Sequence, residues 1–519
     1  MNILLTAINA KYIHSNLAVY SLRACAGEYR DAVELAEYTI NNQKDYILEE
    51  LYKRKPDVLC FSCYIWNIDY VTDIAREYKK LCPSVPIWVG GPEVSYEVEA
   101  FLRENPYIDG VMIGEGEDTF RELCGYYAHK RKLSDIAGIA FRKNSTGNST
   151  SVNNIGGNKA GEIVFTSPRP IKNMSEIPFC YDTLDDFSNR IIYYESSRGC
   201  PFSCSYCLSS VDKTLRFRNT EIVKRELKFF IDQKVPQIKF VDRTFNCNHA
   251  HAMELWRFIK ANDNGVTNFH FEISADLLNQ EELELISDMR PGLIQLEIGV
   301  QSTNEVTIKE IHRTMKLERL KEVVKLIQSG NNIHEHLDLI AGLPYEDYDS
   351  FGRSFDEIYE LKPNQLQLGF LKVLKGSYMF EHAAEYGIVY HDKPPYEVMS
   401  TKWLSFDDVI KIKRVEDMLE VYYNSGQFEI TMKLMECIFD SAFEFFQELG
   451  DFYEANGYFG MSHSRIRRCE ILLEFLALYL HGCDSDDMAS VGLSGNAGDR
   501  DNTAVSYTHL RAHETEADL

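Results

Sequence analysis

The first part of the chain, residues 1–135, alternates short apolar runs with amphipathic stretches. Runs such as ILLTAI, VLCFSCYI, IWVGG and GVMIG have the length of buried strands, and IDYVTDIAREYKKL repeats apolar residues at helical spacing. This pattern predicts a βαβα order and a Rossmann-like, doubly wound parallel sheet with helices on both faces. Ligands of such sheets bind beyond the carboxyl ends of the strands. Most of the predicted strand ends are small or glycine-rich, which allows a ligand to approach the backbone; they are residues 9–11, 62–64, 90–92 and 114–116.

A second alternating series begins at Ile191 and predicts another domain over residues 186–400. Its strand candidates are IIYYES, QIKFVD, FHFEIS, LIQLEIG, IHEHLDLI and QLQLGFL, and helix-compatible segments separate them. Six β/α units favour a (β/α)6 partial barrel over a closed eight-stranded one. The intervening segment, residues 136–185, contains the Ser/Asn/Gly-rich stretch 143–162, which is typical of an exposed hairpin tip or linker.

The predicted barrel strands are polar on one face. In the fourth strand Gln295, Glu297 and Gln301 alternate with apolar residues, and the fifth strand repeats the pattern with His336 and Asp338. A fully buried parallel strand is usually apolar on both faces. If the apolar faces pack on the helices, charged groups face the barrel interior, where they need partners or a ligand. The interior is therefore predicted to bind something large and polar.

The last part of the chain changes to helical periodicity. Stretches such as VIKIKRVEDMLEVYYNS and RRCEILLEFLALYLHG predict a helical module over residues 401–485. Residues 486–519 lose this periodicity, and their ending VSYTHLRAHETEADL resembles translated sequencing-adaptor sequence. We therefore expect an unstructured tail of artefactual origin and leave it out of the predicted fold.

The composition argues against several classes of protein. A formal net charge of -24 over 519 residues disfavours nucleic acid or an anionic membrane surface as the main partner, because both would repel the chain. No apolar stretch approaches membrane-spanning length, and the N-terminus lacks the basic region and cleavage site of a signal peptide. Most of the 13 cysteines stand singly among apolar residues, as expected for reduced thiols in a cytoplasmic protein.

Three cysteines are clustered instead, in the stretch SSRGCPFSCSYCLSS after the first predicted barrel strand. Their spacing is C-x3-C-x2-C, at Cys200, Cys204 and Cys207. Three thiolates can ligate three corners of a cubane iron-sulfur cluster and leave the fourth iron open for a substrate or cofactor. A zinc knuckle completed by His249 or Cys247, or three unrelated thiols, are the alternatives.

The sequence RGCPFSCSYC resembles the signature of the radical S-adenosylmethionine (SAM) superfamily. The resemblance implies that the three cysteines hold a 4Fe-4S cluster whose fourth iron is chelated by SAM, with Tyr206 beside the cofactor. It also implies that an electron from a flavodoxin or ferredoxin type of reductant cleaves SAM to methionine and a 5'-deoxyadenosyl radical. The superfamily's six-unit partial barrel agrees with the six strands counted above.

Three further segments match that superfamily by position. FVDRTFN follows the second strand, EIGVQS closes the fourth and DLIAGLP follows the fifth. The resemblance implies SAM contacts from Asp242, Arg243, Glu297, Gln301 and Asp338. FVDRTFN departs from the Gly-Gly-Glu form usual at its position. A buried neutral pair of His336 and Asp338 is the alternative to a SAM contact there.

The N-terminal domain resembles the cobalamin-binding domain that precedes the barrel in one radical SAM subgroup. The matching segments are FSCYIWN, VGGPEVS and MIGEGEDTF. The resemblance implies cobalamin contacts from Ser62, Gly90, Gly91, Gly114, Glu115 and Gly116. The Asp-x-His-x-x-Gly loop that supplies an axial histidine is absent, and the corresponding loop contains only His14. A cobalt ligand and a helix-start or surface histidine both stay open for that residue.

Together these features resemble bacterial cobalamin-dependent radical SAM proteins with a C-terminal domain of unknown function. They predict an enzyme that methylates or rearranges an unactivated carbon of a small-molecule or lipid-like substrate. The alternatives are a radical SAM cyclase or dehydrogenase with a vestigial cobalamin domain, and a non-enzymatic redox or cobalamin sensor. Methylthiolation is disfavoured, because Cys60, Cys63 and Cys82 are not spaced for a second cluster. The sequence identifies neither the substrate nor a catalytic residue.

Overall fold

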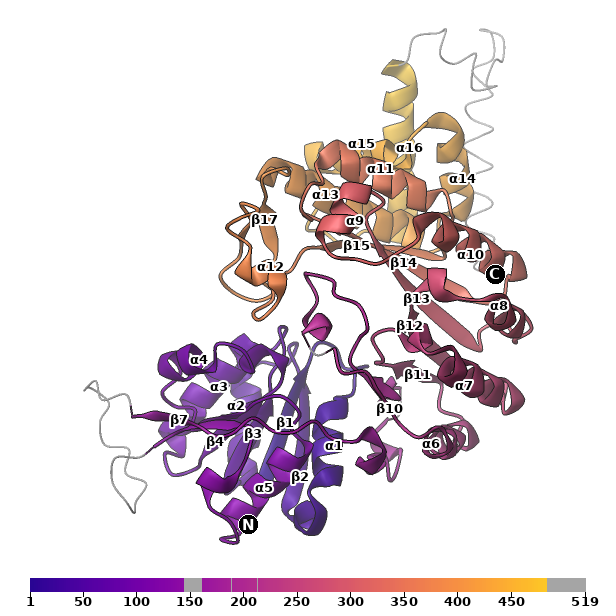
Figure 1. Ribbon diagram of the computed structural model, residues 1–519. Coiled ribbons are helices and arrows are strands. Elements are labelled where there is room, and N and C mark those ends of the chain that lie inside the picture. The colour runs from indigo at the N-terminus through magenta and orange to yellow at the C-terminus, as the bar shows by residue number, and fades with distance from the viewer. Residues whose placement is uncertain (144–160, 188, 212, 483–519) are drawn as a thin grey trace, which may run out of the picture.

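The computed structural model describes residues 1–143, 161–187, 189–211 and 213–482. The N-terminal part forms a seven-stranded sheet in the order β2-β1-β3-β4-β5-β6-β7 (Figure 1). The first five strands are parallel: β1 (Ile3–Asn9), β2 (Val33–Thr39), β3 (Val58–Ser62), β4 (Ile87–Gly90) and β5 (Gly110–Met112). At the edge, β6 (Ile139–Arg142) and β7 (Ile163–Phe165) run antiparallel.

Helices cover both faces of this sheet, as predicted. They are α1 (Leu17–Cys25), α2 (Lys44–Arg54), α3 (Ile68–Leu81), α4 (Val98–Glu104) and α5 (Glu117–Tyr127). On one face Leu5 shares a hydrophobic cluster with Val19 of α1 and Phe120 of α5. On the other face Leu4 shares a second cluster with Leu51 of α2 and Ile74 of α3. The sheet is therefore doubly wound.

The sequence pattern missed two elements in this domain. β2 and α2 were not predicted, because β2 pairs only with β1 and includes partly exposed positions, so it has no continuous apolar run. The five strands within residues 1–135 are parallel, as predicted, and the edge strands β6 and β7 beyond them add an antiparallel extension. Part of the predicted hairpin, residues 144–160, lies outside the described residues, as does the predicted tail 486–519.

The middle of the chain forms a six-stranded parallel sheet in the order β15-β14-β13-β12-β11-β8, which confirms the six predicted strands. The strands are β8 (Ile192–Tyr194), β11 (Gln237–Phe240), β12 (Asn268–Ile273), β13 (Ile294–Gln301), β14 (His334–Ala341) and β15 (Gln365–Phe370). The helices between them are α6 (Thr220–Asp232), α7 (His249–Ala261), α8 (Gln280–Ser287), α9 (Glu305–Glu310), α10 (Leu317–Gly330) and α11 (Tyr348–Tyr359). Along β13 the apolar residues are buried and the polar ones partly exposed, so the polar face is turned away from the helices.

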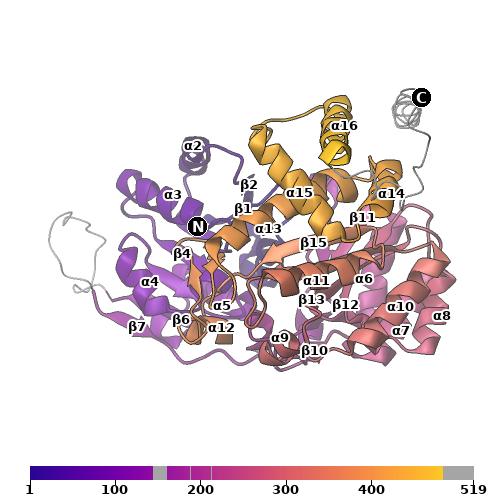
Figure 2. The ribbon, with the colours of Figure 1, turned by 90° about the horizontal axis from the view of Figure 1, so that it is seen from above.

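The C-terminal part begins with α12 (Tyr378–Glu381) and a short antiparallel pair, β16 (Val389–Tyr390) and β17 (Val398–Ser400). The helices α13 (Phe406–Leu419), α14 (Glu429–Ile438), α15 (Ala442–Ala455) and α16 (Arg465–Gly482) follow, with a π-helical turn at Glu420–Asn424. Figures 1 and 2 place these helices over the β15 edge of the barrel. The predicted helical C-terminal region is confirmed.

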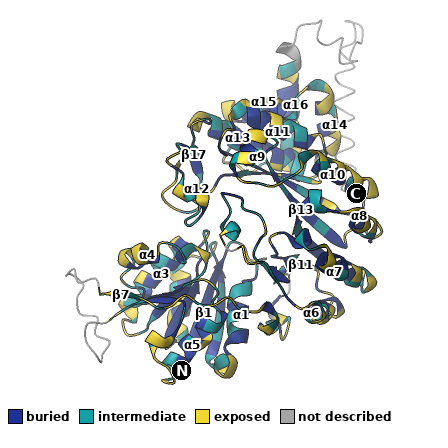
Figure 3. Cartoon of the chain, viewed as in Figure 1, coloured by how far each residue is buried: buried dark blue, intermediate teal, exposed yellow. Residues whose placement is uncertain are grey.

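The core is continuous between the parts of the chain. The larger hydrophobic cluster contains Ile3 of the N-terminal sheet, Phe271 of the barrel and Phe446 of α15. Figure 3 shows the buried residues running along both sheets, with exposed positions on the outer helices. Among the described residues, no helix is long and apolar enough to span a membrane.

Candidate functional site

The three clustered cysteines lie on the loop between β9 (Ser197–Arg198) and a short helical turn (Leu208–Ser210), just beyond β8. We call residues 199–208 the cysteine loop. Cys200 and Cys204 are buried and Cys207 is half-buried, and all three are free thiols. The backbone N–H of Cys207 donates to the carbonyl of Cys204 at 3.1 Å. In the described part of the chain, no three His, Cys, Asp or Glu side chains are arranged to hold a metal ion.

Asp242 supports the start of the cysteine loop. Its fully buried carboxylate accepts hydrogen bonds from the backbone N–H of Ser196 at 2.9 Å, the Ser196 hydroxyl at 2.7 Å and the Ser197 hydroxyl at 2.5 Å. Burial raises the pKa of Asp242, and these hydrogen bonds oppose the rise. The structure therefore places this predicted SAM contact beneath the loop, where it holds the chain that leads into Cys200.

Arg313, which the sequence did not indicate, supplies a cation beside the cysteines. Its Nη1 lies 3.8 Å from Cys204 Sγ and donates to the Tyr206 hydroxyl at 3.2 Å, while Nη2 donates to the carbonyl of Gly299. Burial raises the pKa of the Cys204 thiol, and the guanidinium acts in the opposite direction. Arg313 thus favours the thiolate form that metal binding requires.

A small cavity of about 140 Å³ adjoins Cys204. Four of the predicted SAM residues line it together, and they are Arg243, Glu297, Gln301 and Asp338. Around this cavity Gln301 Oε1, Asp338 Oδ1 and Arg313 Nε are buried without a hydrogen-bond partner. Because unpaired buried polar atoms are costly, this set fits a polar ligand, as SAM would be.

Two carboxylates of this cavity differ in their electrostatic environment. Burial, with Glu297 and Glu272 nearby, raises the pKa of Asp338 to about 7. Burial also acts to raise the pKa of Glu297, but hydrogen bonds from His270 at 2.9 Å and Lys239 at 2.8 Å hold it at about 2. The cavity thus combines a permanently charged carboxylate with one that takes up a proton near neutral pH.

The backbone at the end of β13 is shaped for this cavity. Gln301 has a positive φ of 77° after a register shift between Gly299 and Gln301. A Cβ at position 299 would lie 2.3 Å from Gln301 Nε2, so only glycine lets this side chain fold back. The predicted alternative of a His336–Asp338 pair is wrong, since His336 Nε2 contacts Gln295 Nε2 at 2.9 Å and Asp338 Oδ1 has no partner.

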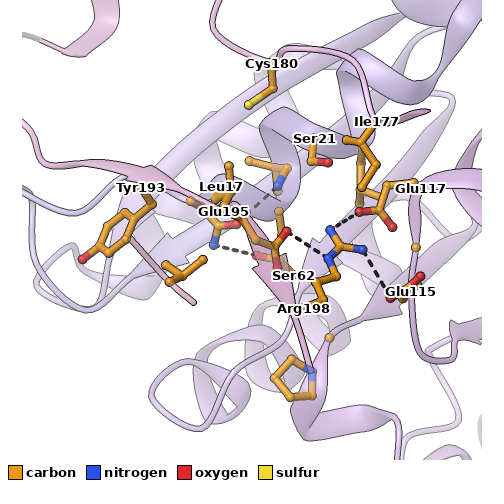
Figure 4. Close-up of a pocket in the computed structure, with 18 of the residues that line it drawn as sticks. Leu17, Ser21, Ser62, Glu115, Glu117, Ile177, Cys180, Tyr193, Glu195 and Arg198 are labelled. Carbon is orange, nitrogen blue, oxygen red and sulfur yellow. Dashed lines mark hydrogen bonds and ion pairs between the residues drawn. The ribbon is translucent and has the colours of Figure 1, made fainter. Parts of the chain in front are cut away.

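A larger cavity of about 790 Å³ lies between the N-terminal sheet and the barrel (Figure 4). All six predicted cobalamin contacts line it: Ser62, Gly90, Gly91, Gly114, Glu115 and Gly116. Gly91 has φ of +126°, and a Cβ there would lie 2.4 Å from the carbonyl oxygen of Cys63. At Gly114, with φ of +75°, a Cβ would meet nothing within 4 Å. Gly114 therefore leaves open space beside the backbone, which fits a large planar group, whereas Gly91 allows the close approach of Cys63. We call the side of the cavity formed by Gly90, Gly91, Gly114 and Gly116 the glycine wall.

An ion network joins this wall to the cysteine loop (Figure 4). Arg198, which lies two residues before Cys200, contacts Glu195 at 2.9 Å, Glu117 at 2.5 Å and Glu115 at 3.4 Å. Glu115 also contacts Arg216 at 2.6 Å. Glu115 therefore binds two arginines of the barrel side as well as lining the cavity. This network was not predicted from the sequence, because its members come from distant segments.

Two histidines considered in the sequence have other contacts. His14 lines the large cavity, and its Nδ1 lies 2.7 Å from the Tyr193 hydroxyl. His249 Nδ1 lies 2.9 Å from the carboxylate of Glu282. A zinc knuckle completed by His249 is therefore disfavoured. Arg243 lines both the large and the small cavity, so it stands where the two spaces adjoin.

The sequence matches three protein-family models in chain order. They are a B12 binding domain over residues 3–124, the radical SAM superfamily over residues 194–358 and a protein of unknown function, DUF4080, over residues 384–491. The first match covers the glycine wall of the large cavity, and the second covers the cysteine loop and the small cavity.

Two curated proteins are similar to about two thirds of the chain. It is 28% identical over 361 residues to the cobalamin-dependent radical SAM methyltransferase TokK of Streptomyces tokunonensis, with 65% of this chain and 49% of that protein covered. It is 22% identical over 355 residues to the anaerobic magnesium-protoporphyrin IX monomethyl ester cyclase of Rubrivivax gelatinosus, with 65% of this chain and 60% of that protein covered. The match to TokK thus spans about half of that relative.

A solved structure is similar over almost the whole chain. The cobalamin-dependent S-adenosylmethionine radical enzyme OxsB, with aqua-cobalamin and S-adenosylmethionine bound, superposes with a TM-score of 0.65 at 15% sequence identity. The superposition covers 99% of this chain and 80% of that one. At this level of identity the likeness shows the fold.

Proposed function

Because the chain is a radical SAM protein with a B12-binding domain ahead of its barrel, we propose that it methylates an unactivated carbon of a small or lipid-like substrate. Its cofactors are those of the matched domains: a 4Fe-4S cluster, SAM and cobalamin. The observation that carries the proposal is the pair of adjoining cavities, one beside the cysteines and one along the glycine wall, with Arg243 lining both.

When bound, the cluster and SAM would supply radical chemistry at the acceptor carbon, and cobalamin would supply the methyl group. The protein supplies binding and placement. We assign the cluster to Cys200, Cys204 and Cys207, with Arg313 stabilising the thiolates. Asp338 and Gln301 offer unpaired acceptors to the polar end of SAM. Asp242 keeps the cysteine loop at the end of β8.

The large cavity receives cobalamin in this proposal. The open space at Gly114 lets the corrin ring approach the backbone, and Ser62, Gly90 and Gly91 line the same cavity. We propose the limits 1–135 for this domain, 136–185 for the linker, whose strands β6 and β7 extend the N-terminal sheet, 186–400 for the barrel and 401–485 for the helical region. The electron comes from a one-electron donor of flavodoxin or ferredoxin type.

A radical cyclisation without methyl transfer is the second candidate, favoured by the similarity to the magnesium-protoporphyrin cyclase. Anaerobic reconstitution with iron, sulfide and aquacobalamin, followed by dithionite and SAM, separates the candidates. Methyl transfer predicts both 5'-deoxyadenosine and S-adenosylhomocysteine. A cyclase predicts 5'-deoxyadenosine alone, and a sensor predicts neither product.

A further inference from the structure

A segment outside both cavities connects the loops that we assign to the two cofactors. We call residues 371–400 the bridging segment; it contains α12, β16 and β17 and leads from β15 into the C-terminal helices. In Figure 1 its orange ribbon extends from the C-terminal part toward the N-terminal domain. The family model of unknown function begins within it, at residue 384.

One side of the bridging segment binds the loop that follows Gly90, residues 91–97, which we call the β4–α4 loop. The Tyr396 hydroxyl donates to the carboxylate of Glu93, and Lys375 Nζ lies 4.0 Å from the same carboxylate and 5.3 Å from the Tyr396 ring centroid. Burial raises the pKa of Glu93, and the contacts to Tyr396 and Lys375 oppose the rise. The contact therefore consists of a buried acid held by two partners from the bridging segment.

Gly376 fits the bridging segment closely against the same loop. It has φ of +82°, and a Cβ there would lie 2.2 Å from Cδ1 of Tyr96. Tyr96 in turn lines the large cavity, as does its neighbour Ser95. Any side chain at position 376 would therefore displace a wall of the proposed cobalamin site.

The other side of the bridging segment binds the cysteine loop. The backbone N–H of Met379 donates to the carbonyl of Ser205 at 2.9 Å, and Ser205 lies directly after Cys204. Met379 is fully buried. Residues 375–379 thus touch both cofactor loops, and a chain of this length spans at most about 14 Å between its ends.

Internal hydrogen bonds keep this short span from extending. Val373 N–H donates to the carbonyl of Tyr396 at 3.0 Å, and Val398 N–H donates to the carbonyl of Leu371 at 2.8 Å. The Ser377 hydroxyl caps α12 by accepting from the backbone N–H of Phe380 at 3.2 Å. The start and the end of the bridging segment, residues 371–373 and 396–398, therefore bind each other, and the segment between them binds the two loops.

We propose that the bridging segment fixes the distance between the β4–α4 loop and the cysteine loop, with Lys375, Gly376 and Tyr396 as positioning residues for methyl transfer. The inference rests on the proposed function for its chemistry. Transfer between two bound groups depends steeply on their distance and angle, and a displacement of about 1 Å can lower a rate about 100-fold. Cleavage of SAM depends on the cysteine loop and the small cavity, so it should tolerate the same displacement of the β4–α4 loop.

The test compares Tyr396→Phe and Gly376→Ala with a matched control, Tyr423→Phe. The control also removes a tyrosine hydroxyl, which donates to the carbonyl of Pro363 away from both cavities. In the chain without cofactors, hydrogen–deuterium exchange of residues 91–97 should be faster in the two test variants and unchanged in the control. After reconstitution, S-adenosylhomocysteine formation should fall at least tenfold in the test variants, while 5'-deoxyadenosine formation stays within about twofold.

The outcomes separate the two proposals. Unchanged exchange in residues 91–97 of Tyr396→Phe, or equal loss of both products, would overturn the positioning role. If the unaltered protein forms 5'-deoxyadenosine without S-adenosylhomocysteine, the proposed methyl transfer fails. In that case faster exchange in Tyr396→Phe alone still supports the mechanical link between the loops.

Discussion

Replacing Gly114 with alanine tests whether the glycine wall binds cobalamin. A Cβ at Gly114 would meet no protein atom within 4 Å, so the added methyl group projects into open space at the edge of the large cavity. Its positive φ of 75° costs an alanine about 1 kcal/mol of folding stability. If the corrin ring occupies that space, overpacking costs a further ~1–3 kcal/mol of binding free energy, or a ~5- to 150-fold weaker Kd.

Gly265 provides a matched control for the backbone cost. It also has φ of +75° and nothing within 4 Å of a Cβ, but it does not line either cavity. Thermal unfolding should show a similar small loss for Gly114→Ala and Gly265→Ala. Titration with aquacobalamin, followed by absorbance, should show weaker binding for Gly114→Ala alone. Equal affinity for both variants would refute the placement of cobalamin along this wall.

Three further variants probe other parts of the account. Arg313→Gln removes the cation that stabilises the Cys204 thiolate. This variant should form 5'-deoxyadenosine at least ~10-fold more slowly and bind corrinoid with unchanged affinity; unchanged SAM cleavage would contradict the role of Arg313. Asp242→Ala leaves the backbone N–H of Ser196 and the hydroxyl of Ser197 without their acceptor, at a cost of ~1–3 kcal/mol per unpaired buried group, and iron analysis should find a depleted cluster. Burial raises the pKa of Glu335 to about 8, above its unfolded value of about 4.3, so folding takes up a proton at pH values between the two. The free energy of unfolding therefore falls as pH rises through this range, by at most ~1.4 kcal/mol per pH unit. Glu335→Gln should remove this dependence, and melting temperatures at pH 6 and pH 8.5 that shift equally in both proteins would reject it.

The barrel strands could be predicted from the sequence because buried and exposed positions alternate along them. In β13 polar and apolar residues alternate, and in β14 buried positions alternate with more exposed ones; that period of two indicates both the strand and its inward face. The cluster-binding role of the three cysteines could be predicted because they lie close together in the sequence. The same holds for the glycines at the ends of β4 and β5, whose positions follow directly from the end of an apolar run.

The contacts that hold the two cavities together could not be predicted, because they join segments that are far apart in the sequence. Arg313 meets Cys204 across 109 residues, and Tyr396 meets Glu93 across 303 residues. Neither arginine nor tyrosine stands out in its own stretch of sequence. The predicted role of Asp242 illustrates the same limit, since its position after β11 was correct but its partners, Ser196 and Ser197, became visible only in the fold.

The most direct test of the central claim is 5'-deoxyadenosine formation by the anaerobically reconstituted, dithionite-reduced protein, compared with Cys204→Ala and with the exposed free cysteine variant Cys437→Ala. We expect SAM cleavage in the unaltered protein and in Cys437→Ala, and none in Cys204→Ala. Cleavage that persists in Cys204→Ala would contradict the assignment of the cluster to the cysteine loop.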